Sequence, residues 1–272
     1  MKLSVPLGQL SFVAESNENS GVENVLEQVL SYGIKSIDVS AEDLDKYGVS
    51  YIKKLHEAYG IDSSAMCELL DFKYKESDIL KENSKRQLER CSEINCPIFM
   101  PVPVVREKLE NENARIDALK MTVEYLNDTS EISKQYGITT TVENFSSTNT
   151  PISLISDISY ILEQLPYVKY VFDSGNFWFG GTDMLKACRK FAEHTVFVHL
   201  KDIKENKEGC LKVNGRCADS VAIGEGELPI FEALNVLKTA GYKGAFQVEI
   251  NNLDSQMMSR IETSVNNLKK IM

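Results

Sequence analysis

Four residues in the second half of the chain combine the side-chain types of a divalent-metal site: Glu143, Asp173, His199 and Glu249. Each lies at or near the end of a β-rich run, and successive members are 30, 26 and 50 residues apart. Three carboxylates and an imidazole around one point would destabilise each other unless a cation lay between them. Three oxygens and one nitrogen suit Mn²⁺ or Mg²⁺, and also Zn²⁺, Co²⁺ or Fe²⁺. We therefore predict one divalent metal ion with these four residues as its ligands.

The elements that would position these residues follow a repeated pattern, in which a short β-rich run precedes a helical stretch. Eight such runs occur, at residues 3–8, 34–40, 61–72, 96–103, 138–145, 168–177, 195–202 and 244–250. Eight βα units in 272 residues predict an α/β fold, a closed (β/α)8 TIM barrel that forms a single domain over residues 1–272. An open doubly wound sheet is the alternative, but Gln9 follows Gly8 where its Gly-rich first turn would continue. Residues 203–227 are expected to form a long loop.

A TIM barrel places its chemistry where strands end and βα-loops begin. Side chains along a strand alternate between the barrel interior and the helix layer. If the parity of the four residues faces inward, they converge at the top of four consecutive strands. In the first half of the chain, Asp38 and Glu68 are expected to be further inward-facing acids.

Composition argues against several other classes of protein. The net charge of −10 disfavours a nucleic-acid partner, because binding to phosphates needs clustered Lys and Arg. No stretch approaches the roughly 18 apolar residues of a membrane span, and the N-terminal residues are better explained as a first strand than as a signal peptide. The six cysteines form no CxxC motif, which favours reduced thiols in a cytoplasmic protein.

Five short motifs resemble the sugar phosphate isomerase/epimerase family of xylose isomerase-like TIM barrels. They are TVEN (141–144), FDSGN (172–176), VHLKD (198–202), GEG (224–226) and GAFQVE (244–249). The order and register of the resemblance hold from about residue 138 to residue 250. It implies that Glu143, Asp173, His199 and Glu249 are the metal ligands, and that Glu143 and Glu249 are the catalytic acid/base pair.

Three further residues are candidates for binding substrate. Asn176 stands where the related epimerases carry a substrate-binding His, and Arg216 is the only candidate for their substrate-binding Arg in the 203–227 segment. Lys201 shares the parity of His199, so it is expected either to hold a substrate hydroxyl or phosphate, or to be a surface lysine paired with Asp202. The related endonucleases need a His-rich site, which three histidines cannot supply.

This set of residues predicts an isomerase or epimerase of a small carbohydrate. The metal would act as a Lewis acid on the carbonyl and stabilise an enediolate, while one glutamate removes the proton beside it and the other donates a proton in return. Dehydration of a keto-polyol after the same first step is the nearest alternative, and a non-catalytic sugar-binding barrel is a second one. A homo-oligomer is possible.

Overall fold

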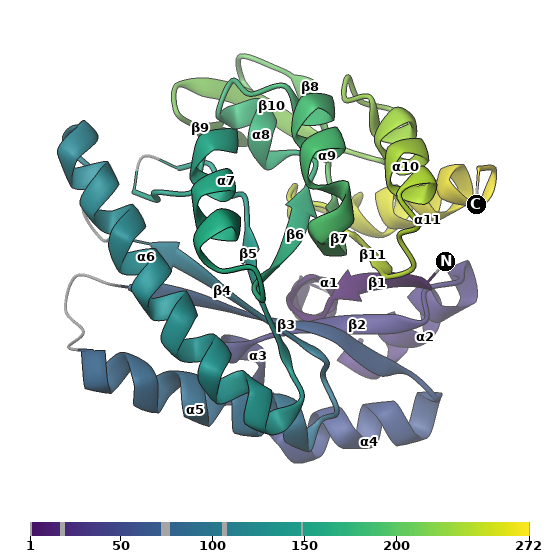
Figure 1. Ribbon diagram of the computed structural model, residues 1–272. Coiled ribbons are helices and arrows are strands. Elements are labelled where there is room, and N and C mark those ends of the chain that lie inside the picture. Colours follow the sequence, from purple (N-terminus) through teal and green to yellow (C-terminus); the bar gives the residue numbers. More distant parts are fainter. Residues whose placement is uncertain (1, 17–19, 72–76, 105–107, 148, 272) are drawn as a thin grey trace.

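The computed structural model describes residues 2–16, 20–71, 77–104, 108–147 and 149–271. Eight parallel strands close into a barrel in the order β1-β11-β7-β6-β5-β4-β3-β2 (Figure 1). These strands are β1 (Lys2–Pro6), β2 (Ser36–Ser40), β3 (Asp62–Asp71), β4 (Ile98–Val104), β5 (Thr139–Glu143), β6 (Lys169–Asp173), β7 (Thr195–Leu200) and β11 (Ala245–Val248). The predicted TIM barrel is confirmed, and the open sheet is not formed.

Helices surround the barrel and connect its successive strands (Figure 1). They are α1 (Leu7–Ser16), α2 (Val22–Tyr32), α3 (Ala41–Tyr47), α4 (Val49–Tyr59), α5 (Ser77–Glu93), α6 (Glu112–Ser133), α7 (Ile155–Gln164), α8 (Asn176–Phe179), α9 (Met184–Phe191), α10 (Ile230–Thr239) and α11 (Met257–Lys269), with 3-10 turns η1 (Lys134–Tyr136) and η2 (Ala192–His194). The βα pattern did not predict the short helices α1, α3 and α8. Gly60 ends α4 with φ +62°, which is the left-handed cap that glycine adopts without strain.

The barrel interior is apolar below the strand ends of β4, β6 and β7. Met100, Val102, Val171 and Phe197 are buried there in one cluster, together with Ala65 and Ile98. Val171 and Phe197 lie two residues before Asp173 and His199, respectively. Because side chains alternate along a strand, this packing fixes the inward parity of β6 and β7.

The predicted loop 203–227 is wrong in part, because this segment contains a small antiparallel sheet. Its strands β8 (Asp202–Glu205), β9 (Leu211–Val213) and β10 (Arg216–Val221) pair in the order β8-β10-β9. Asn214 and Gly215 form the turn between β9 and β10 with φ of 53° and 77°. Asn-Gly is a strong hairpin signal, and it was available in the sequence. Ile203 and Ala218 are buried against Phe179 of α8, so the sheet supports the loop that follows β6.

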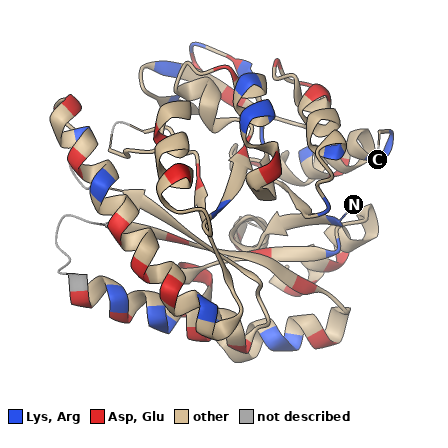
Figure 2. Ribbon diagram, in the orientation of Figure 1, with Lys and Arg blue, Asp and Glu red and all other residues tan. Residues whose placement is uncertain are grey.

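The outer surface carries both signs of charge in mixture. Figure 2 shows Lys and Arg interspersed with Asp and Glu along α5 and α6. Within the part of the chain that the structure describes, no helix combines the length and the apolar character needed to cross a bilayer.

Candidate metal centre

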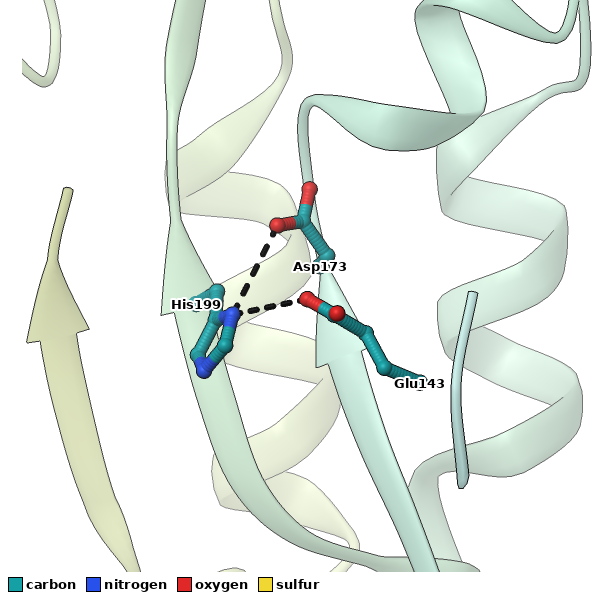
Figure 3. A group of neighbouring side chains, drawn as sticks. All are labelled: Glu143, Asp173 and His199. Atoms are coloured by element: carbon teal, nitrogen blue, oxygen red, sulfur yellow. Dashed lines mark ion pairs between the residues drawn. The ribbon is translucent and has the colours of Figure 1, made fainter. Parts of the chain in front are cut away.

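The four predicted ligands meet at the top of adjacent strands. Glu143 and Asp173 are the last residues of β5 and β6, His199 is in β7, and Glu249 directly follows β11. These strands are neighbours in the barrel, and Asp173 is in register with His199. Figure 3 shows the carboxylates of Glu143 and Asp173 pointing toward the ring of His199. The predicted convergence of the four residues is therefore observed.

One nitrogen, His199 Nδ1, faces all three carboxylates. It lies 2.7 Å from Glu143 Oε1, 3.5 Å from Glu249 Oε2 and 3.7 Å from Asp173 Oδ2. Glu143, Asp173 and His199 are buried, and one ligand atom from each lies within 4.8 Å of the others. Three oxygens and one imidazole nitrogen that face one point from three sides fit a divalent cation.

The pKa values of the cluster are shifted by burial and by the charges of neighbouring groups. Burial disfavours a charged His199, but Glu143, Asp173 and Glu249 outweigh this effect and raise the pKa of His199 to about 10. Burial raises the pKa of Glu143, against the opposing effect of His199. Burial also opposes ionisation of Asp173, but Lys201 and His199 overcome it and lower the pKa of Asp173 to about 2. Divalent positive charge would stabilise all three carboxylates together.

Lys201 is part of this cluster and not a surface lysine. Its ammonium lies 2.9 Å from Asp173 Oδ2 and 2.9 Å from Glu249 Oε1, and the side chain is buried. The alternative that Lys201 pairs with Asp202 at the surface is wrong, because Asp202 is itself fully buried and accepts hydrogen bonds from the backbone of the GEG turn at Gly224 and Gly226.

The residues after Asp173 orient its carboxylate. Asp173 Oδ1 accepts hydrogen bonds from the backbone N–H groups of Gly175, at 2.8 Å, and Asn176, at 2.7 Å. This leaves Oδ2 as the oxygen that faces the cluster. A backbone turn thus fixes which oxygen of Asp173 is available to a metal.

Asn144 is a positioning residue that the sequence motifs contained but that sequence reasoning did not single out. Its amide accepts from Asp173 N and donates to Asp173 O, each at 3.0 Å. The side chain therefore extends the pairing of β5 with β6 by one residue, beyond Glu143. Tyr170 also donates to Asn144, which is fully buried. A polar residue directly after a predicted ligand, inside a buried run, is the signal that would have identified it.

Two of the predicted substrate-binding residues take part in bonds within the protein. Asn176 begins α8, and its side-chain amide donates to Asn144 O at 2.9 Å. Arg216 of β10 lies over the ring of Trp178, 3.6 Å from its centre, and donates to the Trp178 carbonyl. Arg216 therefore links the small sheet to α8 through these two contacts. Their contacts with substrate stay predictions.

Of the two further acids expected to face inward, one does and one does not. Asp38 accepts from Ser4 and Gln247, which are inward residues of β1 and β11. The prediction for Glu68 is wrong, because it accepts from Asn83 and Gln87 of α5 and so faces the helix layer. The cause is a register shift: Ile37 and Val39 of β2 pair with Ser63 and Met66 of β3, so β3 holds one extra residue and its alternation reverses.

Two curated proteins are similar to this chain in sequence. The chain is 24% identical over 247 residues to an inosose isomerase of Halalkalibacterium halodurans (87% of this chain, 85% of that protein). It is 25% identical over 262 residues to an inosose isomerase of Bacillus licheniformis (92% of this chain, 91% of that protein). Both relatives thus match along nearly their whole length.

Solved structures share the fold. A crystal structure of the IolI protein with a bound zinc atom matches with a TM-score of 0.77 at 18% identity, over 100% of this chain and 98% of that one. A D-allulose 3-epimerase from a Methylomonas species, in complex with D-allulose, matches with a TM-score of 0.75 at 12% identity, over 100% and 97%. The model of the xylose isomerase-like TIM barrel family matches residues 26–271. The chain therefore belongs to the xylose isomerase-like TIM barrel family.

Proposed function

We propose that this protein is a divalent-metal-dependent isomerase or epimerase of a small carbohydrate, which moves a proton on a carbon next to a carbonyl. The observation that carries the proposal is the convergence of three carboxylates and His199 Nδ1 on one point at the mouth of the barrel. The two curated relatives are isomerases by name, which supports an enzyme of this class. Among small carbohydrates, their names favour a keto-polyol.

Glu143, Asp173, His199 and Glu249 would hold the metal ion. The orientation of Asp173 Oδ2 by the turn at Gly175 and Asn176, and the burial of Glu143, Asp173 and His199, suit such an ion. When bound, the ion would supply a Lewis acid that polarises a substrate carbonyl. A zinc atom is bound in the similar IolI structure, which supports a metal here without fixing its identity.

Glu143 and Glu249 would move the proton. Glu143 ends β5 and Glu249 directly follows β11, so they lie on either side of the strands that carry Asp173 and His199. One carboxylate can take a proton from one face of the substrate while the other group, in its protonated carboxyl form, donates a proton to the opposite face, which inverts the configuration. Donation to the neighbouring carbon instead converts an aldose to a ketose. Burial raises the pKa of Glu143, which makes its carboxylate a stronger base than a solvated one.

Lys201, Asn176 and Arg216 remain the proposed substrate-binding residues. The ammonium of Lys201 is placed at the cluster itself and can donate to a substrate oxygen. Asn176 and Arg216 would contact substrate from the loop after β6 and from the small sheet that packs on it.

The test is product analysis with the purified protein on a panel of unphosphorylated and phosphorylated ketoses and on inososes. The protein is first stripped with a chelator and then supplied with Mn²⁺, Mg²⁺, Zn²⁺, Co²⁺ or Fe²⁺. We expect an epimer or an aldose–ketose isomer to form only after a metal is restored. Release of a dehydrated product, or equal turnover in the stripped protein, would contradict the proposal.

A further inference from the structure

The Lys201 ammonium pairs with a carboxylate oxygen that a bound metal ion would also need. Asp173 Oδ2 is 2.9 Å from Lys201 Nζ and 3.7 Å from His199 Nδ1, so one oxygen serves both cationic groups. Asp173 Oδ1 is held by two backbone N–H groups. A metal ligated by Asp173 would therefore use the same oxygen that now pairs with Lys201.

The chain places this lysine with specific contacts. The Lys201 backbone N–H donates to Ser174 Oγ at 2.9 Å, and Ser174 Oγ donates to the Lys201 carbonyl at 2.8 Å. A Cβ atom on Gly175 would lie 2.8 Å from Lys201 Cβ, so glycine leaves the room that the lysine stem needs. Residues 173–175 thus supply one metal ligand and also the support for the lysine beside it.

Glu249 is the second partner of Lys201 and can keep the ammonium at the site. Glu249 Oε1 accepts from Lys201 at 2.9 Å and from Asn251 at 3.0 Å, while Glu249 Oε2 faces His199. An ammonium displaced from Asp173 can therefore keep its contact with Glu249. With a divalent ion present, three carboxylates, one ammonium and the ion together carry no net charge.

We propose that Lys201 is a built-in counter-ion of the metal centre. In the metal-free protein its ammonium holds Asp173 and Glu249 together, and a divalent cation displaces it from Asp173 Oδ2 on binding. The proposal rests on the metal site of the proposed function. If Lys201 only supported the structure, its removal would weaken metal binding. The counter-ion role predicts the opposite: removal of the lysine tightens metal binding, because a competing positive charge is lost.

The experiment is calorimetric titration of chelator-stripped protein with Mn²⁺, on the wild type, Lys201→Met and Lys201→Gln. Lys204→Met is the matched control, because Lys204 is exposed on β8 and its loss changes the net charge equally. We expect at least tenfold tighter Mn²⁺ binding in both Lys201 variants and no change in the control. We also expect the metal-free Lys201 variants to unfold at a lower temperature than the metal-free wild type, and Mn²⁺ to raise their Tm by more.

The outcomes separate the two proposals. A wild type that binds no Mn²⁺, Zn²⁺ or Co²⁺ refutes the metal centre, and with it the role of Lys201. A wild type that binds metal, with unchanged or weaker binding in the Lys201 variants, refutes the counter-ion role alone. Should Lys201→Met fail to fold, Lys201→Gln decides, since its amide keeps a polar contact with one carboxylate without the charge.

Discussion

Two groups of acids lie at the strands of this barrel, and they differ in what surrounds them. Glu143, Asp173 and Glu249 face one another around His199 and Lys201. Asp38 and Glu68 on β2 and β3 instead accept hydrogen bonds from neutral amides and a hydroxyl. Neutral donors can satisfy part of the hydrogen-bonding capacity of a single buried carboxyl, whereas three carboxylates at one point need cations. An acid on a barrel strand therefore indicates a metal site only where its neighbours are acids too.

The largest expected effect separates the two groups by activity. Glu143→Gln and Glu249→Gln should each lower kcat/KM by about 10³-fold or more, because each change removes a proposed metal ligand that is also a proposed proton carrier. The matched change Glu68→Gln, also a buried glutamate, should leave kcat/KM within a few-fold. Steady-state kinetics with saturating metal measure all three. Undiminished turnover in Glu143→Gln or Glu249→Gln would remove that residue from the mechanism.

Asp38, an acid outside the cluster, should affect the pH dependence of the free energy of unfolding. Burial raises its pKa to about 6, although Ser4 and Gln247 oppose the shift. The folded protein then binds a proton that the unfolded chain releases near pH 4, so the free energy of unfolding falls by up to about 3 kcal/mol as the pH rises from 4 to 6 and is constant above. Asp38→Asn should remove this dependence, as denaturant titrations at pH 4 to 7 can show. If the free energy of unfolding falls with pH by the same amount in the wild type and in Asp38→Asn, Asp38 does not titrate in this range.

Asn144 tests whether the acid cluster depends on its supporting hydrogen bonds. Asn144→Ala removes both backbone contacts to Asp173 and should weaken Mn²⁺ binding by about 10- to 100-fold. Asn149→Ala, on the loop that follows, is the control and should leave the Kd unchanged. Equal Kd values in wild type and Asn144→Ala would show that Asp173 is held without this amide.

The last expected effect is on the pH dependence of metal binding. The acids raise the pKa of His199 to about 10, so a proton must leave the cluster before Nδ1 can bind a metal. The apparent Kd for Mn²⁺ should therefore fall as the pH rises from 6 to 9, by at most about tenfold per unit. Titration calorimetry in buffers of different ionisation enthalpy should show proton release. A Kd that is constant over this range would contradict a protonated His199.

The sequence predicted those features of the molecule that depend on patterns within a single segment of the chain. The βα rhythm and the twofold alternation along a strand are local, and they placed Glu143, Asp173, His199 and Glu249 correctly. The extra residue in β3 depends on pairing with β2, so no local pattern warned that Glu68 would turn outward. The same limit applies to Lys201, whose partners are distant in sequence and meet only when the barrel closes.

The metal centre itself is most directly tested by diffraction. Crystals grown with Mn²⁺ should give one anomalous peak at the mouth of the barrel, with oxygens of Glu143, Asp173 and Glu249 and the Nδ1 of His199 at ligand distance of roughly 2.0–2.3 Å. Absence of a peak at these four residues under saturating Mn²⁺, or a peak held by other residues, would contradict the central claim.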